Sequence, residues 1–124
     1  MKHLLLVDDH RAITMGLRCL LLNEFADLEI EAAGDETAAR KAVEVGHWDL
    51  AVVDINLPGR SGLELIGTLK VQRPFLKVLI YTMYPEDQFG LRALRSGADG
   101  YVTKDSPLES LFEAIRQVLR GQKY

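Results

Sequence analysis

Short apolar segments recur along the chain, and each is followed by polar or turn-forming residues. Continuous apolar runs bounded by such breakers indicate strands that are buried on both faces. The segment 28–33 differs, because Leu28, Ile30 and Ala32 alternate with two glutamates, which indicates a half-exposed strand near a sheet edge. We expect strands at residues 4–7, 28–33, 51–54, 76–81 and 100–103.

The segments between these strands carry apolar residues at helical spacing. Ile13, Leu17, Leu20 and Leu21 occupy positions i, i+4, i+7 and i+8, which predicts one buried face of a helix that ends near Asn23. The last helix is expected to bury an apolar stripe formed by Leu108, Leu111, Phe112, Ile115, Val118 and Leu119.

Capping and helix-breaking residues predict where the remaining helices begin and end. Asp35 suits the N-cap of a second helix, and Gly46 fits the left-handed conformation that would end it. The last helix is expected to be capped by Ser106-Pro107. The third and fourth helices are expected to run from Leu63 to Arg73-Pro74 and from Pro85-Glu86-Asp87 to Ser96-Gly97.

Strand and helix thus alternate five times along the chain. Alternation with short connections requires parallel strands, right-handed crossovers and helices on both faces of the sheet. A chain of 124 residues is long enough to bury the core of one such domain. We therefore expect a single doubly wound α/β domain over residues 1–124.

Composition narrows the classes of function. A net charge of −3 argues against a domain that itself binds the backbone of a nucleic acid. The apolar stretches are too short to cross a bilayer and no leader segment opens the chain, so a cytoplasmic protein without a membrane partner is expected. Cys19 is the single cysteine and has no partner for an internal disulfide, and the three histidines lack the spacing of a zinc site.

Polar residues follow four of the expected strands at the point where each ends. Asp8 and Asp9 follow the first strand, Asp54 the third, Thr82 the fourth and Lys104 the fifth. Because parallel strands present their carboxyl ends at one edge of the sheet, these side chains should converge. Asp54 alone would more often be a turn cap, and the others have equally ordinary explanations. Their joint occurrence favours a chemical site.

The residue types at this edge suggest the chemistry. Three clustered carboxylates repel one another unless a cation lies among them. Lys104 offsets one charge, and the remaining all-oxygen ligand set suits Mg²⁺ better than Zn²⁺. A carboxylate beside Mg²⁺ can attack phosphorus and form an aspartyl phosphate. The metal, Lys104 and the Thr82 hydroxyl could then compensate the charge on the transferring oxygens.

This ordered set of residues resembles the receiver domain of two-component response regulators over the whole chain. The matching motifs are Asp8-Asp9, Asp54 within Val-Val-Asp-Ile-Asn-Leu-Pro-Gly, Thr82, and Tyr101-Val-Thr-Lys104. The Val-Asp-Asp-His opening and the Gly-Tyr-Val-Thr-Lys-Asp stretch are most similar to the NarL/FixJ (LuxR-type) branch. The resemblance implies a five-stranded flavodoxin-like sheet with strand order 2-1-3-4-5.

The resemblance also implies a role for each residue of the site. Asp54 would be the phosphoacceptor. Asp9, Asp54 and the backbone carbonyl of Asn56 would bind Mg²⁺ directly, and Asp8 would act through a bound water. Lys104 would pair with Asp54 before phosphoryl transfer and with the phosphoryl oxygens afterwards.

The implied switch involves residues further along the chain. Thr82 would bond to the phosphoryl group and draw its loop inward, and Tyr101 would follow by changing rotamer. The output would be a population shift of the surface formed by the fourth helix, fifth strand and fifth helix. Family members often have a small residue after the Thr82 position, whereas the Met83 side chain could crowd the path of Tyr101.

Two further residues are expected to border the phosphoryl group. Asn56 and Tyr84 each lie two positions past a residue of the site. We hypothesise that Tyr84 restricts the attacking water and so lengthens the lifetime of the phosphorylated state, because excluding water suppresses hydrolysis.

The implied partners follow from the family. The phosphodonor would be a histidine kinase or a small phosphodonor, and the chain would catalyse only its own phosphorylation and dephosphorylation. A homodimer formed on phosphorylation is compatible with the sequence. NarL/FixJ relatives continue past a segment like 119–124 into a linker and a helix-turn-helix domain, so DNA would be bound only through that absent domain. A stand-alone receiver is the competing interpretation.

Three other functions stay open as alternatives. A haloacid-dehalogenase-like phosphatase also uses an aspartyl nucleophile, but it needs a second acid where this chain has Asn56. An FMN binder should have a hydroxyl- and glycine-rich phosphate loop after the first strand, where Asp8 and Asp9 would repel a phosphate unless a metal intervened. The third is a receiver-like interaction module that is never phosphorylated, which the intact set of acids disfavours.

Overall fold

The structure is a computed structural model that describes residues 2–59 and 61–124. Along this part of the chain the elements are β1 (Lys2–Val7), α1 (Arg11–Glu24), β2 (Leu28–Ala33), α2 (Glu36–Val45), β3 (Leu50–Val53), α3 (Gly62–Gln72), β4 (Lys77–Thr82), α4 (Glu86–Ser96), β5 (Gly100–Thr103) and α5 (Leu108–Leu119). The strands form one parallel sheet in the order β2-β1-β3-β4-β5. The predicted fold class and strand order are therefore confirmed.

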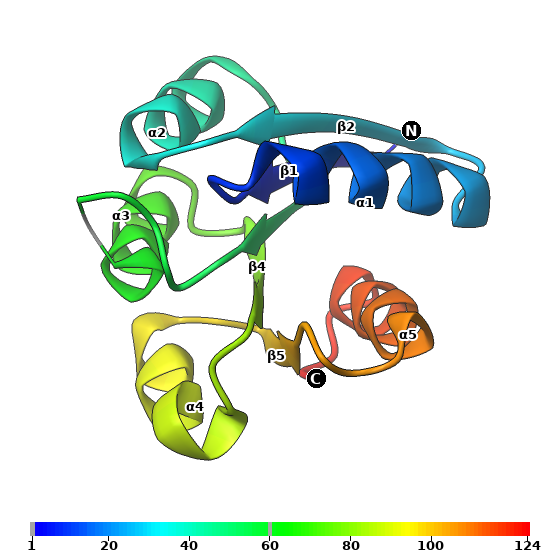
Figure 1. The fold of residues 1–124 in the computed structure, drawn as a ribbon. Helices are drawn as coiled ribbons and strands as arrows, with labels where there is room; N and C mark the ends of the chain where they lie inside the picture. The colour runs from blue at the N-terminus through cyan, green and yellow to red at the C-terminus, as the bar shows by residue number, and fades with distance from the viewer. Residues whose placement is uncertain (1, 60) are drawn as a thin grey trace.

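The sheet separates two layers of helices (Figure 1). Helices α1 and α5 cover one face, and α2, α3 and α4 cover the other. Successive residues of β1 enter the two layers in turn: Leu5 and Val7 pack with the α2–α4 layer, whereas Leu4 and Leu6 pack with α1 and α5. The uninterrupted apolar run of this strand is explained by its burial on both faces.

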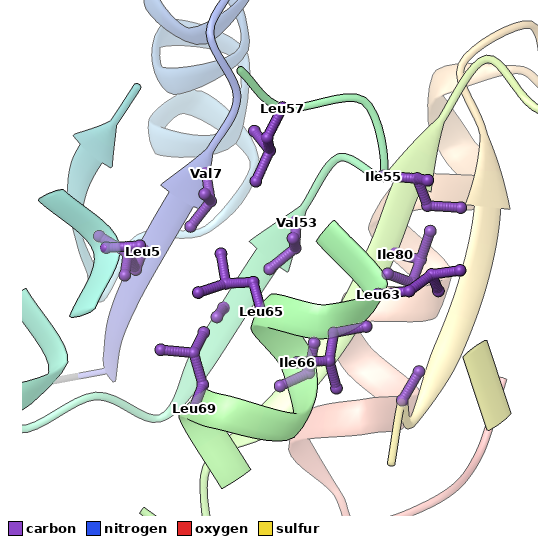
Figure 2. Close-up of a cluster of buried hydrophobic side chains, with 14 of the residues drawn as sticks. Leu5, Val7, Val53, Ile55, Leu57, Leu63, Leu65, Ile66, Leu69 and Ile80 are labelled. Atoms are coloured by element: carbon purple, nitrogen blue, oxygen red, sulfur yellow. The ribbon is translucent and has the colours of Figure 1, made fainter. Parts of the chain in front are cut away.

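Helix α3 is the most deeply packed element of its layer. Figure 2 shows Leu65, Ile66 and Leu69 of α3 directed at the sheet, where Val53 of β3 lies beneath them. All three leucine and isoleucine side chains are fully buried, and each such burial contributes about 1.5–3 kcal/mol. This packing holds α3 against the sheet.

The buried face predicted for α1 is only partly correct. Leu17 and Leu21 are buried, but Ile13 and Leu20 are 39% and 47% exposed. Thr14 is buried in their place, and its hydroxyl donates to the carbonyl of Arg11, so this buried hydroxyl has its partner. The helix therefore rests on the sheet along positions 14, 17 and 21, a stripe rotated from the predicted one.

Of the predictions for the two ends of α2, one is confirmed and one is wrong. Asp35 is the N-cap as predicted, and its side chain accepts a hydrogen bond from the amide of Ala38. Gly46 follows the helix but is extended, with φ −109°, so the predicted left-handed end is wrong. The indole of Trp48 donates to the carbonyl of Ala42 at 2.7 Å, and a Cβ on Gly46 would lie 2.8 Å from its Nε1. Glycine is required here for that close approach.

The other boundaries lie close to the predicted ones. Helix α4 ends at Ser96 with Gly97 in the left-handed conformation, φ +105°. Helix α5 begins at the predicted pair, with Pro107 as the N-cap, but the Ser106 hydroxyl does not cap the helix and instead bonds to that of Thr103 at 2.7 Å. Strand β3 ends at Val53, so Asp54 is the first residue beyond it.

None of the helices in the described ranges has the length and apolar character needed to span a membrane.

Candidate phosphoryl-transfer site

The carboxyl ends of the strands bring the predicted residues together at one rim of the sheet. Backbone hydrogen bonds extend the parallel ladder one residue past β1, β3 and β5. Asp54 donates its amide to Val7, Asp8 to Ala33 and Lys104 to Thr82. Side chains that are up to 96 positions apart in sequence are thereby fixed at neighbouring points of the rim.

Asp54 lies at the centre of the site and is only 4% exposed. Its Oδ1 accepts the hydroxyl of Thr82 at 2.7 Å and the amide of Asn56 at 3.2 Å. Its Oδ2 accepts Lys104 Nζ at 3.0 Å. Both carboxylate oxygens are therefore oriented by donors from other parts of the rim.

Gly62 explains why the start of α3 can lie so close to the backbone of Asp54. A Cβ at this position would lie 2.1 Å from the Asp54 carbonyl oxygen. The amide of Gly62 donates to the carbonyl of Ile55 at 2.8 Å, and the Ser61 side chain caps α3 by accepting from Leu63. The first turn of α3 thus rests directly on the backbone that carries the central aspartate, an approach that only glycine permits.

Lys104 bridges two acids at the base of the site. Its Nζ donates to Asp8 Oδ2 at 2.6 Å and to Asp54 Oδ2 at 3.0 Å, and its side chain is 8% exposed. Burial by itself would lower the pKa of Lys104, but the hydrogen bonds and charges of Asp8 and Asp54 outweigh burial and raise it. The lysine is therefore charged in the folded protein.

Asp8 is held in its charged form by the same contacts. Burial alone would raise the pKa of its carboxyl, but hydrogen bonds from Lys104 and from the amide and ring of His10 outweigh burial and lower it. Asp9 is the most exposed of the three acids, with 35% of its side chain accessible. Nδ1 of His10 lies 3.0 Å from Asp8 Oδ1 and 3.1 Å from Asp9 Oδ1, so the ring joins the two acids.

The predicted convergence is therefore seen directly for Asp8, Asp54, Thr82 and Lys104, which form one connected set of hydrogen bonds. Asp9 joins this set only through His10, within the contacts of the described ranges. The ligand atoms of Asp8, Asp9 and His10 lie within 4.8 Å of one another, a spacing that could hold a metal ion. Sequence reasoning set His10 aside when it considered zinc, and its position directly after the acid pair was the available signal.

Tyr101 is buried beside the site, with 7% of its surface exposed. Its hydroxyl donates to the carbonyl of Tyr84 at 2.8 Å. Burial, reinforced by the charges of Glu86, Asp54 and Asp87, raises the pKa of this phenol to about 12, so it is a donor at neutral pH. Met83 is 63% exposed, so the crowding expected of this side chain is not seen with the ring in its buried position.

A hollow opens over the central aspartate. Asp54, Thr82 and Lys104 lie within it, and its rim is formed by His10, Ile13, Asn56, Tyr81, Met83 and Tyr84. Asn56 and Tyr84 thus line the hollow over Asp54, and their predicted position beside a phosphoryl group stays a prediction. Ile13 and Tyr81 were not predicted, because the sequence pattern assigned both to the core. Their exposure could only be found from the way α1 begins and β4 ends beside the site.

The protein is a doubly wound α/β domain with an acidic rim that a lysine bridges. Comparison of its sequence with known protein families gives the family. The family model for the response regulator receiver domain matches residues 4–116. Response regulator GacA of Pseudomonas aeruginosa is 34% identical over 128 residues, covering 100% of this chain and 58% of GacA. The chain therefore belongs to the response regulator receiver domain family, and it spans little more than half the length of that relative.

Two solved structures are closely similar. A LuxR-family two-component response regulator from Aurantimonas has a TM-score of 0.92 and 33% identity, covering 98% of this chain and 86% of that one. The response regulator TrrA of Thermotoga maritima, solved in complex with Mg²⁺-BeF, has a TM-score of 0.84 and 32% identity, covering 95% of this chain and 99% of that one. These similarities agree with the NarL/FixJ (LuxR-type) branch predicted from the sequence.

Proposed function

We propose that Asp54 is the phosphoacceptor of a signalling switch that a histidine kinase controls. The observation that carries this proposal is the pair of hydrogen bonds on its carboxylate, Thr82 Oγ1 on Oδ1 and Lys104 Nζ on Oδ2. A buried carboxylate with both oxygens oriented, lying in an open hollow, is arranged as a nucleophile for an incoming phosphoryl group.

The acid set fits a magnesium ion. Asp8, Asp9 and Asp54 bring three carboxylates to the rim, whereas Lys104 is the ammonium group that bridges two of them. Hard oxygen donors with excess negative charge suit Mg²⁺. Asp9, Asp54 and the backbone carbonyl of Asn56 would hold the ion directly, and Asp8 through a water. When bound, it would neutralise charge on the acids and on the phosphoryl oxygens. TrrA, solved with Mg²⁺-BeF, supports this assignment by analogy.

The transfer step uses the chain's own groups. An oxygen of the Asp54 carboxylate attacks phosphorus, the bond from phosphorus to the donor breaks, and the leaving group departs with that electron pair. Lys104 stays protonated and moves from the carboxylate to a phosphoryl oxygen, while the Thr82 hydroxyl donates to another. Charge compensation by positioned donors is the main contribution that a protein makes to phosphoryl transfer.

The response to phosphorylation would run through Thr82 and Tyr101. The Tyr101 hydroxyl already bonds to the loop that follows Thr82, through the carbonyl of Tyr84. When Thr82 bonds to the phosphoryl group, this buried ring position would be favoured over an outward one. The population of the surface formed by α4, β5 and α5 would shift accordingly, because the phosphorylated site would bind one arrangement better.

The whole protein would act as a cytoplasmic regulator of transcription. The relative named above is a response regulator of which this chain covers 58%, and the Aurantimonas neighbour belongs to the LuxR family. DNA would be bound only through a further C-terminal domain, and phosphorylation would favour a homodimer. The chain would catalyse its own phosphorylation and dephosphorylation and have no external product.

The test is the mass of the intact protein after incubation with Mg²⁺ and acetyl phosphate or phosphoramidate. We expect the parent to gain one phosphoryl group and the Asp54→Asn variant to gain none. Asp35→Asn is the matched control, because Asp35 is an exposed helix cap on α2. An unmodified parent, or a variant that is still modified, would refute the assignment and favour an interaction module that is not phosphorylated.

A further inference from the structure

Tyr84 is held at two separate points. Its backbone carbonyl accepts the hydroxyl of Tyr101 at 2.8 Å. Its ring packs edge to face on Phe89 of α4, with the ring centroids 5.0 Å apart and an interplanar angle of 72°. Tyr84 also forms part of the wall of the hollow over Asp54. The ring of Tyr84 therefore links the wall of the hollow to α4.

Phe89 is itself fixed in place. It is half-buried and packs against the core cluster beneath α4, as Tyr84 does. The guanidinium of Arg92, one turn further along the helix, lies over the Phe89 ring at 5.7 Å from its centroid. With one ring anchored, the edge-to-face geometry restricts where the other can lie.

We infer that Phe89 is a positioning residue for the aspartyl phosphate: it keeps the Tyr84 ring at the mouth of the hollow, where the ring limits access of water to phosphorus. This inference rests on the proposed phosphorylation of Asp54. It connects α4, an element of the proposed output surface, to the lifetime of the phosphorylated state. A partner that pulls Phe89 away from Tyr84 would then shorten that lifetime without touching the site.

The reaction that this pair controls is hydrolysis. A water oxygen forms a bond to phosphorus, and the bond between phosphorus and the Asp54 carboxylate oxygen breaks, with its electron pair staying on the carboxylate. The water gives up a proton to bulk solvent, and inorganic phosphate leaves. Access of that water is the quantity that a ring at the mouth can change.

The test is a double-mutant cycle on the rate at which the phosphorylated protein loses its phosphoryl group. Phe89→Leu keeps apolar bulk but removes the aromatic pair. We expect it to speed hydrolysis about two- to tenfold, which is the range that an aromatic pair provides. In a Tyr84→Ala background the same substitution should have no further effect, because the ring that it positions is gone. The rate of phosphorylation should be unchanged.

Matched variants separate positioning from a general effect on α4. Leu91 lies on the same helix, is 61% exposed, and should leave hydrolysis unchanged when replaced by Ala. Phe89→Tyr, which keeps the ring, should restore the parent lifetime. Two outcomes would overturn the inference but leave the proposed function standing. In the first, Phe89→Leu speeds hydrolysis equally in the parent and in the Tyr84→Ala variant. In the second, Phe89→Leu leaves the rate of hydrolysis unchanged although Tyr84→Ala raises it. Failure of the parent to form any adduct would overturn both.

Discussion

Nζ of Lys104 lies 3.0 Å from Oδ2 of Asp54, although α3, β4, α4 and β5 separate the two residues in sequence. The ammonium group is also 2.6 Å from Asp8 Oδ2, so one buried cation is shared by two buried anions. The contact orients the Asp54 carboxylate, so we expect the lysine to contribute to stability as well as to the proposed chemistry.

Replacing Lys104 with Met should weaken both properties. Two buried carboxylates would be left without their cation, and we expect the free energy of unfolding to fall by about 3 kcal/mol in the absence of divalent ions. Added Mg²⁺ should recover part of this loss, because an ion that binds only the folded state stabilises it. Phosphorylation by acetyl phosphate should be about 100-fold slower. Urea denaturation and intact mass measure the two effects.

Lys41→Met is the control for Lys104→Met, since Lys41 is an exposed lysine on α2. It should leave both the stability and the rate unchanged. A Lys104→Met protein as stable as the parent, with or without Mg²⁺, would show that the shared cation contributes nothing to folding.

Stability should depend on pH in two separate windows. The folded protein lowers the pKa of Asp8 and Asp99 below 3.8, so their contribution is complete above that value and is lost as the pH falls through the folded pKa. It raises the pKa of Lys104 above 10.5, so that contribution is complete below 10.5 and is lost as the pH rises through the folded pKa. Urea denaturation across the pH range should therefore show a plateau between these limits.

The Asp99→Asn variant tests the predicted loss of stability at low pH. Burial alone would raise the pKa of Asp99, but the amide of Val78 and the ammonium groups of Lys70 and Lys123 outweigh burial and lower it. The variant should be less stable than the parent at neutral pH, and its stability should fall less steeply below about pH 4. An identical slope in parent and variant would contradict the assigned pKa direction.

Gly46→Ala should destabilise the protein although the backbone there is not left-handed. The new Cβ would lie 2.8 Å from Nε1 of Trp48, and we expect a loss of about 1–3 kcal/mol together with a change in tryptophan fluorescence. Gly16→Ala is the opposite case. This glycine lies inside α1, and a Cβ added to it would meet nothing within 4 Å, so alanine should stabilise by about 0.5–1 kcal/mol. Thermal unfolding of both variants gives the comparison.

The C-terminal residues should become more mobile when Lys123 is replaced by Met. Lys123 Nζ lies 3.2 Å from Asp99 Oδ1, and the amide of Tyr124 donates to the Asp99 carbonyl at 2.9 Å. Loss of the side-chain contact should lower the heteronuclear NOE of the residues that end the chain. Lys70→Met removes another cation from the same carboxylate, but from α3, and should leave those NOE values unchanged. If Lys123→Met and Lys70→Met lowered these NOE values equally, the contact between Lys123 and Asp99 would have no specific role in holding the C-terminal residues.

Much of this fold follows from local sequence patterns. The apolar runs of β1, β3 and β4 are buried on both faces, and such runs leave few other arrangements once helices alternate with them. The convergence of Asp8, Asp54, Thr82 and Lys104 follows from parallel strands alone. These predictions succeeded because the type and the end of each element follow from its own segment, and parallel pairing then places the strand ends at one edge.

The features that sequence reasoning missed depend on contacts between distant segments. The apolar positions of α1 are compatible with more than one buried stripe, and the sheet beneath it selects Thr14 over Ile13 and Leu20. Gly46 is extended, and the close approach of the Trp48 indole to it is a contact that no local pattern reveals. The bridging position of His10 depends on how the loop after β1 turns.

The backbone bonds that join each rim residue to the neighbouring strand have a consequence for biosynthesis. Lys104 follows β5, the last of these strands to leave the ribosome, and a slip of one residue in any strand would turn its terminal side chain to the opposite face. A nascent or misregistered chain therefore lacks an assembled acceptor. On the proposed assignment of Asp54, only a chain whose sheet is completely paired would accept a phosphoryl group.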